Sequence, residues 1–142
     1  MLDTETTGTD YLQDQIIELG MVAFDYCPET GQIGQVYGTF DELEDPGRPI
    51  PTESTKIHHI TDEMVSGKRI KDSEVEMFIS DVSLIIAHNA NFDRKFVESR
   101  FPIFAKKAWA CTFQQIPWAD EGLSSAKLEF LAFKSGLHYE GH

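Results

Sequence analysis

The sequence predicts an α/β fold in which a mixed sheet of about five strands is flanked by helices. Alternating apolar residues in the first third of the chain are typical of half-buried antiparallel strands. A largely apolar run at residues 82–87 is typical of a buried parallel strand. Helical periodicity on both sides of that run completes the pattern, because strands that alternate with helices form α/β sheets.

Three antiparallel strands are expected in the first part of the chain. Residues 2–5 form a short β-prone run, and residues 36–40 alternate between apolar and polar side chains after a turn at residues 28–31. Between them, residues 15–24 place four apolar side chains on one face: Ile17, Leu19, Met21 and Ala23. The three runs predict a meander, which ends in a Pro-rich loop at residues 45–51.

Helices are expected on both sides of the buried strand. Before it, short helices are predicted around residues 53–57 and 61–65, and apolar spacing predicts a longer helix over residues 72–79. The helix after it has an apolar face that comprises Phe92, Phe96 and Val97. We expect Asn89 or Asn91 to cap the start of that helix, because Asn is a favoured N-cap residue.

The last part of the chain predicts one more strand and one more helix. Residues 109–112 are β-prone and short enough for a fifth strand. Helical spacing follows in Leu128, Leu131, Ala132 and Ser135. Ser124 or Ser125 is expected to cap this helix, and Gly136 is expected to end it.

Length and composition favour one compact domain that spans the chain. Its 142 residues are 41% hydrophobic, which is enough for one core. The two cysteines, Cys27 and Cys111, are expected to be reduced thiols. Apolar runs are too short to span a bilayer and the N-terminus lacks a signal pattern, so we expect a soluble cytoplasmic protein that does not bind membranes.

The charge balance limits how the chain can meet nucleic acid. Asp and Glu number 24 against 12 Lys and Arg, which gives a formal charge of −12. This sign excludes proteins that coat long nucleic acid electrostatically. A site that carries its own cations can still bind a phosphate, because a bound metal ion dominates the local field.

Two groups of acidic residues are candidates for chemistry. Asp3 and Glu5 are two positions apart on an expected strand, so both side chains project from the same face. They are either ligands for a hard metal ion or a pair of solvated acids. Asp93 lies in the first turn of a helix that follows a buried strand, where it is either a ligand or a carboxylate that complements the helix dipole.

Specific strings of residues resemble a known family. Residues 2–8 read LDTETTG, residues 88–93 read HNANFD, and residues 57–63 read IHHITDE. These strings, together with residues 127–142, are similar to the motifs of the DEDD exonuclease superfamily (DnaQ-like, DEDDh branch). That superfamily includes the epsilon proofreading subunit of bacterial DNA polymerase III and ribonuclease T. His59 stands where the family has Gly.

The resemblance implies a ribonuclease H-like sheet and a metal-dependent 3′→5′ exonuclease of the proofreading or end-trimming type. It implies that two Mg²⁺ or Mn²⁺ ions are held by Asp3, Glu5 and Asp93 and that His142 acts as the catalytic base. The residues that would contact the terminal nucleotide are Thr4, Thr6, Gly8, His58 and Phe92. The expected substrate is a single-stranded or frayed 3′ end of DNA or RNA, which is released as nucleoside 5′-monophosphates.

The same resemblance implies that the exonuclease domain of residues 1–142 is shortened. In the family, a further metal-binding Asp follows the His by five residues on a C-terminal helix, and His142 is the last residue here. The family's first strand also begins earlier than Met1. We therefore expect the activity of the chain as it stands to be severely impaired. A DNA polymerase is an implied partner. The alternative interpretation is a catalytically silent nuclease fold that serves as a binding or docking module.

Overall fold

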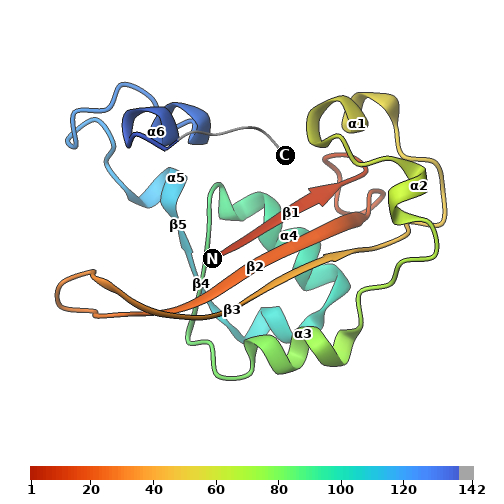
Figure 1. Cartoon of the computed structure of the whole chain (residues 1–142), viewed down its shortest axis with the longest axis horizontal. Helices are drawn as coiled ribbons and strands as arrows, with labels where there is room; N and C mark the ends of the chain where they lie inside the picture. Colours follow the sequence, from red (N-terminus) through yellow and green to blue (C-terminus); the bar gives the residue numbers. More distant parts are fainter. Residues whose placement is uncertain (138–142) are drawn as a thin grey trace.

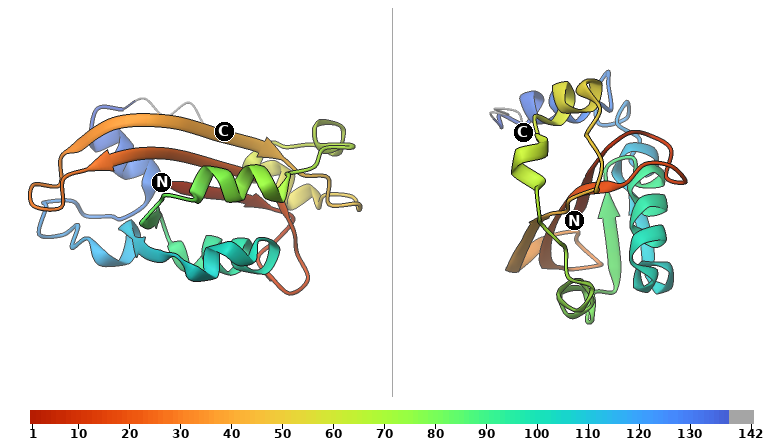
Figure 2. Two further views of the ribbon diagram at one scale, coloured as in Figure 1. Left: turned by 90° about the horizontal axis from the view of Figure 1, so that it is seen from below. Right: turned by 90° about the vertical axis from the view of Figure 1, so that its right-hand side faces the viewer.

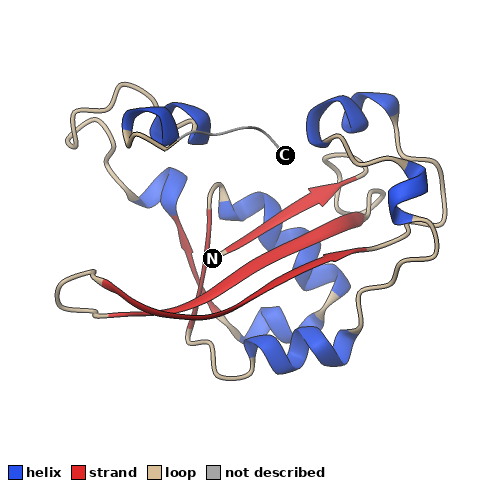
Figure 3. Cartoon of the chain, in the orientation of Figure 1, coloured by secondary structure: helices blue, strands red, loops and turns tan. Residues whose placement is uncertain are grey.

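The computed structural model describes residues 1–137 and confirms the predicted α/β fold (Figures 1 and 3). The strands are β1 (Leu2–Thr6), β2 (Ile16–Tyr26), β3 (Ile33–Leu43), β4 (Leu84–Ala87) and β5 (Ala108–Cys111). The helices are α1 (Thr52–His58), α2 (Asp62–Val65), α3 (Asp72–Ile79), α4 (Ala90–Arg100), the 3₁₀ helix η1 (Pro102–Lys106), α5 (Thr112–Gln115) and α6 (Leu128–Lys134). No helix of this described part is long and apolar enough to cross a membrane.

Strands β1, β2 and β3 form the predicted antiparallel meander, in that order. Ile17, Leu19 and Met21 are buried on one face, as their alternation predicts. Strands β2 and β3 are each 11 residues long; β2 ends two residues after its alternating run of residues 15–24, and β3 extends beyond its run of residues 36–40 by three residues at each end. They do so because ladder hydrogen bonds join the two backbones whether or not the side chains are buried.

The five strands of the described residues hydrogen bond as two sheets rather than as one mixed sheet. The meander is one sheet, and β4 and β5 form a parallel pair as the second. Strand β4 packs against β1, but Figure 1 shows it crossing the direction of β1 instead of running beside it. Ladder bonds need strands that run side by side, so the two sheets meet through side chains.

The main core lies between the meander and the helices α3 and α4 (Figure 2). Its largest fully buried members include Leu19, Ile79, Val97 and Phe104. A smaller cluster of Ile17, Ile50, Ile60 and Val65 packs α1 and α2 against the end of the meander. The helices α1 and α2 therefore lie at one end of the sheet (Figure 1).

The predicted N-caps are wrong at two helices. Asn89 precedes α4 but has φ 61° and makes no side-chain capping bond. A capping side chain requires an extended backbone at the N-cap, and the left-handed conformation of Asn89 is incompatible with it. At α6 the N-cap is Lys127, whose amide donates to Ser125 Oγ at 3.2 Å. Gly136 follows α6 with φ 73°, as predicted for a helix stop.

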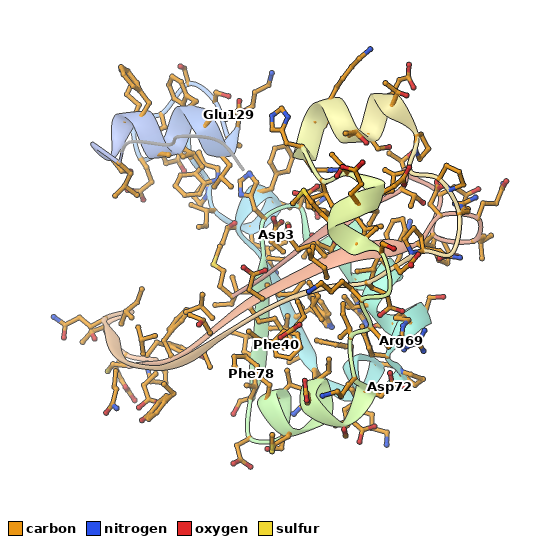
Figure 4. The ribbon with its side chains drawn as sticks, turned by 45° about the vertical axis from the view of Figure 1, so that its right-hand side comes forward. Asp3, Phe40, Arg69, Asp72, Phe78 and Glu129 are labelled. Atoms are coloured by element: carbon orange, nitrogen blue, oxygen red, sulfur yellow. The ribbon has the colours of Figure 1, made fainter. Side chains whose placement is uncertain are left out.

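A buried carboxylate takes part in an ion-pair network that joins β3, α3 and α4. Glu44, directly after β3, is 6% exposed and accepts hydrogen bonds from Arg100 Nε at 3.0 Å and Arg100 Nη2 at 3.2 Å. Arg69 lies 3.2 Å from the same carboxylate, and Arg100 also donates to Asp72 at 2.8 Å. Figure 4 shows Arg69 and Asp72 together beside α3. These ion pairs fix the end of α4 against the end of β3.

Replacing Glu44 by Gln is expected to lower the free energy of unfolding by about 2–3 kcal/mol, because Arg100 then lacks its main counter-charge. The exposed Arg94–Glu98 pair provides the control. Glu98→Gln should cost less than about 0.5 kcal/mol. Urea denaturation measures both variants, and equal losses would contradict the structural role of Glu44.

Candidate active site

Strand β1 separates its side chains between two environments. Asp3 and Glu5 project from one face, where Asp3 is exposed and Glu5 is half-buried. Thr4 and Thr6 project from the other face and are buried. Pleating makes this alternation unavoidable in an extended strand. The prediction that Asp3 and Glu5 share a face is therefore confirmed.

Both carboxylates lie in a cleft of about 630 Å³. The face of the meander that carries Asp3 and Glu5 forms the floor of this cleft. Residues at the end of α1 and on α2 form one wall. The wall residues are His58, His59, Ile60 and Met64. Figure 4 shows Asp3 on the meander, between α6 on one side and the helices α1 and α2 on the other.

Further acidic side chains on the cleft floor escaped the sequence prediction. Glu5 pairs with Glu18 across β1 and β2, while Asp3 pairs with Gly20, which in turn pairs with Asp41 on β3. Glu18, Gly20 and Asp41 line the same cleft. The alternation of β2 places Glu18 opposite its apolar face, and this signal could have identified it. Asp41 could not be found in this way, because its place depends on strand register.

Asp93 lies beneath the strand that carries Asp3 and Glu5. It is 2% exposed, and its Oδ1 accepts a hydrogen bond from Thr4 Oγ1 at 2.8 Å. Burial raises the pKa of Asp93 to about 6. The Thr4 hydroxyl opposes this shift, and the nearby negative charge of Asp3 adds to it. The structure therefore brings Asp93 within electrostatic range of Asp3, although the two residues are far apart in sequence.

The end of α1 shapes the wall of the cleft. His58 is buried, and its Nδ1 accepts a hydrogen bond from the Ile60 amide at 3.0 Å, so its neutral ring carries the proton on Nε2. His59 adopts φ 61° and ψ 8°, a left-handed conformation that favours Gly. The backbone at this position thus has the conformation that suits Gly, with an imidazole attached.

Other predicted site residues make internal contacts. Thr6 Oγ1 donates to the Gly8 carbonyl at 2.6 Å, and a Cβ on Gly8 would lie 2.4 Å from Asp14 Oδ2, which explains why Gly stands there. Phe92 packs on the main core with its ring 5.0 Å from that of Phe96. These contacts leave nucleotide binding by Thr4, Thr6, Gly8, His58 and Phe92 as a prediction. His142, the predicted base, lies outside the described residues.

The candidate ligands match divalent cations in their chemistry but do not surround a common point. Carboxylate oxygens are the ligands that Mg²⁺ and Mn²⁺ prefer, and Asp3, Glu5 and Asp93 supply them. Within residues 1–137, no three His, Cys, Asp or Glu side chains converge closely enough to share one ion. Like charges resist such convergence unless a cation lies between them. The residues fit the cations in chemistry, and the role of each as a ligand stays a prediction.

A larger hollow of about 780 Å³ lies between the β2–β3 hairpin and β4. Its lining is mainly apolar, with residues such as Phe78 and Ile85, and it includes none of the predicted site residues. The paired carboxylates therefore identify the smaller cleft as the candidate site.

The fold and this cleft define an α/β protein with a carboxylate-lined site, and sequence comparison supplies the family. The family model described as exonuclease (RNase T) matches residues 1–142. The chain belongs to this exonuclease family.

Curated relatives include the DNA polymerase III subunit epsilon of Treponema pallidum (strain Nichols). It is 35% identical over 144 residues, which cover 95% of this chain and 63% of the relative. The chain thus spans less than two thirds of that protein. It spans 7% of a PolC-type DNA polymerase III from Thermotoga petrophila, which is 39% identical over 99 residues, or 68% of this chain.

Solved structures share the fold. Exonuclease X in complex with 5′ overhanging duplex DNA has a TM-score of 0.66 and 26% identity, covering 98% of this chain and 74% of that one. The zinc-bound complex of Escherichia coli exonuclease I with single-stranded DNA has a TM-score of 0.69 and 18% identity, covering 98% and 35%. These matches confirm the predicted resemblance to the exonuclease family and the predicted ribonuclease H-like fold.

Removing the charge of Asp93 is expected to stabilise the protein near neutral pH. The pKa of Asp93 is raised in the folded state to about 6 from 3.8, so folding favours its protonated form. Its favourable contribution is complete below pH 4 and is lost as pH rises through about 6. Asp93→Asn should therefore raise the free energy of unfolding by about 1–3 kcal/mol at pH 7.5. The gain should shrink toward pH 4, as measured by denaturation across this range. An equal gain at both pH values would contradict it.

Replacing His59 by Gly is expected to raise the free energy of unfolding by about 1 kcal/mol, because Gly adopts positive φ without steric cost. His59→Asn provides an intermediate case, since Asn tolerates this conformation better than most residues. Thermal melting of the three proteins gives the order. A lower melting temperature for His59→Gly would show that contacts of the imidazole stabilise the fold by more than the left-handed backbone of His59 destabilises it.

Proposed function

We propose that the chain is the catalytic portion of a metal-dependent 3′→5′ exonuclease that releases nucleoside 5′-monophosphates from single-stranded or frayed DNA ends. One observation carries the proposal: Asp3 and Glu5 share the floor of an open cleft, directly above the buried Asp93, in a chain of the exonuclease family. RNA remains an alternative substrate, because discrimination depends on contacts with the 2′-hydroxyl.

In this proposal the carboxylates of the chain bind the divalent cations. Asp3 and Glu5 hold divalent cations from the cleft floor, and Asp93 completes the site from below. Thr4 orients Asp93 through its 2.8 Å hydrogen bond. When bound, Mg²⁺ or Mn²⁺ supplies Lewis-acid stabilisation of the charge on a phosphoryl oxygen. His142 acts as the proton acceptor.

The cleft supports a small footprint on the substrate. Its floor carries Asp3, Glu5, Glu18 and Asp41, and the chain has a charge of −12, so a long polyanion would be repelled. A single terminal nucleotide whose phosphate is neutralised by cations meets less repulsion. Reaching the floor requires that nucleotide to leave its stack, which costs a few kcal/mol in a duplex and favours unpaired ends.

The names of the relatives suggest where such an activity would be used. The T. pallidum relative is a DNA polymerase III subunit, and exonucleases I and X were solved with DNA. We therefore extend the proposal to a polymerase partner and a cytoplasmic location. The competing function is a catalytically silent docking module that keeps the fold without binding Mn²⁺.

Incubating the chain with Mn²⁺ and a 5′-labelled single-stranded DNA is expected to produce a ladder that shortens from the 3′ end. Asp3→Ala should lower the rate by about a hundredfold or more, since it removes charge stabilisation at the reacting phosphate. Asp81→Ala, at an exposed Asp outside the cleft, is the matched control and should cleave normally. Calorimetric titration with Mn²⁺ separates the two functions. A chain that neither binds Mn²⁺ nor cleaves would favour the docking module.

A further inference from the structure

A glycine occupies the centre of the cleft floor. Gly20 lies in the interior of β2, paired with Asp3 on one side and Asp41 on the other. Glycine within a strand weakens the fold, because it loses more backbone entropy and contributes no side-chain packing. A Gly inside a strand often marks a place where a ligand or another backbone approaches the strand closely.

The fold itself supplies no reason for Gly at position 20 within the described residues. The backbone of Gly20 is not in the left-handed region that favours Gly. A Cβ built on Gly20 would meet only the Asp3 carbonyl oxygen, at an ordinary distance of 3.9 Å. Gly8 provides the contrast, because a Cβ there would collide with Asp14. In the described part of the chain there is thus space for a side chain at position 20, although the residue is Gly.

The position of Gly20 indicates what approaches it. Adjacent strands are about 4.8 Å apart, so a group over Gly20 lies one strand spacing from the Asp3 carboxylate. Glu18 precedes it on the same face, and Asp41 lies across from it, so anionic groups are disfavoured there. Ile60 and Met64 supply apolar surface on the adjacent wall. An uncharged group attached to a phosphate fits these surroundings.

We propose that Gly20 is a substrate-binding residue, whose bare backbone is the surface on which the sugar or base of the terminal nucleotide rests. The proposal depends on the proposed nuclease function and assigns a place to the nucleoside beside the phosphate held at Asp3. A side chain at position 20 would rise into the cleft and displace that nucleoside. The same side chain would leave the core intact, because it points away from the face of β2 that carries Leu19 and Met21.

Graded substitution tests the proposal. Gly20→Ala and Gly20→Val are compared with Gly38→Ala, a matched glycine in the interior of β3 whose Cβ would meet Phe78 at 3.7 Å on the core side. All three variants should melt at or above the temperature of the unaltered chain, since Ala and Val suit strands better than Gly. With Mn²⁺ and labelled oligothymidylate, KM should rise about tenfold for Gly20→Ala and about a hundredfold for Gly20→Val. Gly38→Ala should leave KM unchanged.

Binding of thymidine 5′-monophosphate in the presence of Mn²⁺ provides a readout that does not require cleavage. Affinity for this nucleotide should fall in the same order, while calorimetric binding of Mn²⁺ alone stays unchanged in every variant. Unaltered nucleotide affinity and KM in Gly20→Val, with an active parent chain, would overturn this inference and leave the nuclease function standing. A parent chain that binds neither Mn²⁺ nor nucleotide would overturn both. A lower melting temperature in Gly20→Val without weaker nucleotide binding would assign Gly20 to the fold.

Discussion

The two faces of β1 hold the site together. Thr4 points into the protein and donates a hydrogen bond to Asp93 at 2.8 Å, which joins the first strand to α4. Asp3 and Glu5 point the opposite way, into the cleft. Because pleating fixes this alternation, the bond beneath the strand also sets where the two upper carboxylates lie. Loss of register at β1 would turn all of these side chains over and would destroy both the attachment and the cleft floor.

Several features that surround the cleft cost stability. Asp93 is a buried carboxylate whose pKa is raised to about 6, His59 has a left-handed backbone, and Gly20 lies in the interior of a strand. Each would be replaced by a more favourable residue if folding alone mattered. Strain and perturbed ionisation cluster at functional sites, because the surrounding structure can hold what an isolated segment would release. The core beneath the sheet, by contrast, consists of ordinary apolar packing.

Electrostatics explain how so acidic a chain belongs to a family of exonucleases. Four carboxylates, those of Asp3, Glu5, Glu18 and Asp41, line one cleft, so the local field there is negative and attracts cations. The proposed cations would reverse that potential locally, over a region no larger than one or two nucleotides. Acidity elsewhere on the surface then limits contact with the remainder of a strand. The charge of the chain and the small site are thus consistent with end-directed action.

Local pattern in the sequence determined most of the secondary structure. Alternation in β2, the apolar run of β4 and the helical period of α3 are properties of neighbouring residues, and so were the strings that identified the family. Tertiary structure alone decided which strands share a ladder, that Asp41 joins the cleft floor, and that Thr4 bonds to Asp93. It also decided the left-handed backbone of Asn89, which cancelled its expected capping role. The physical reason is that the direction of a side chain depends on the residue's own backbone. Its neighbours across strands, in contrast, depend on register and packing between segments distant in sequence.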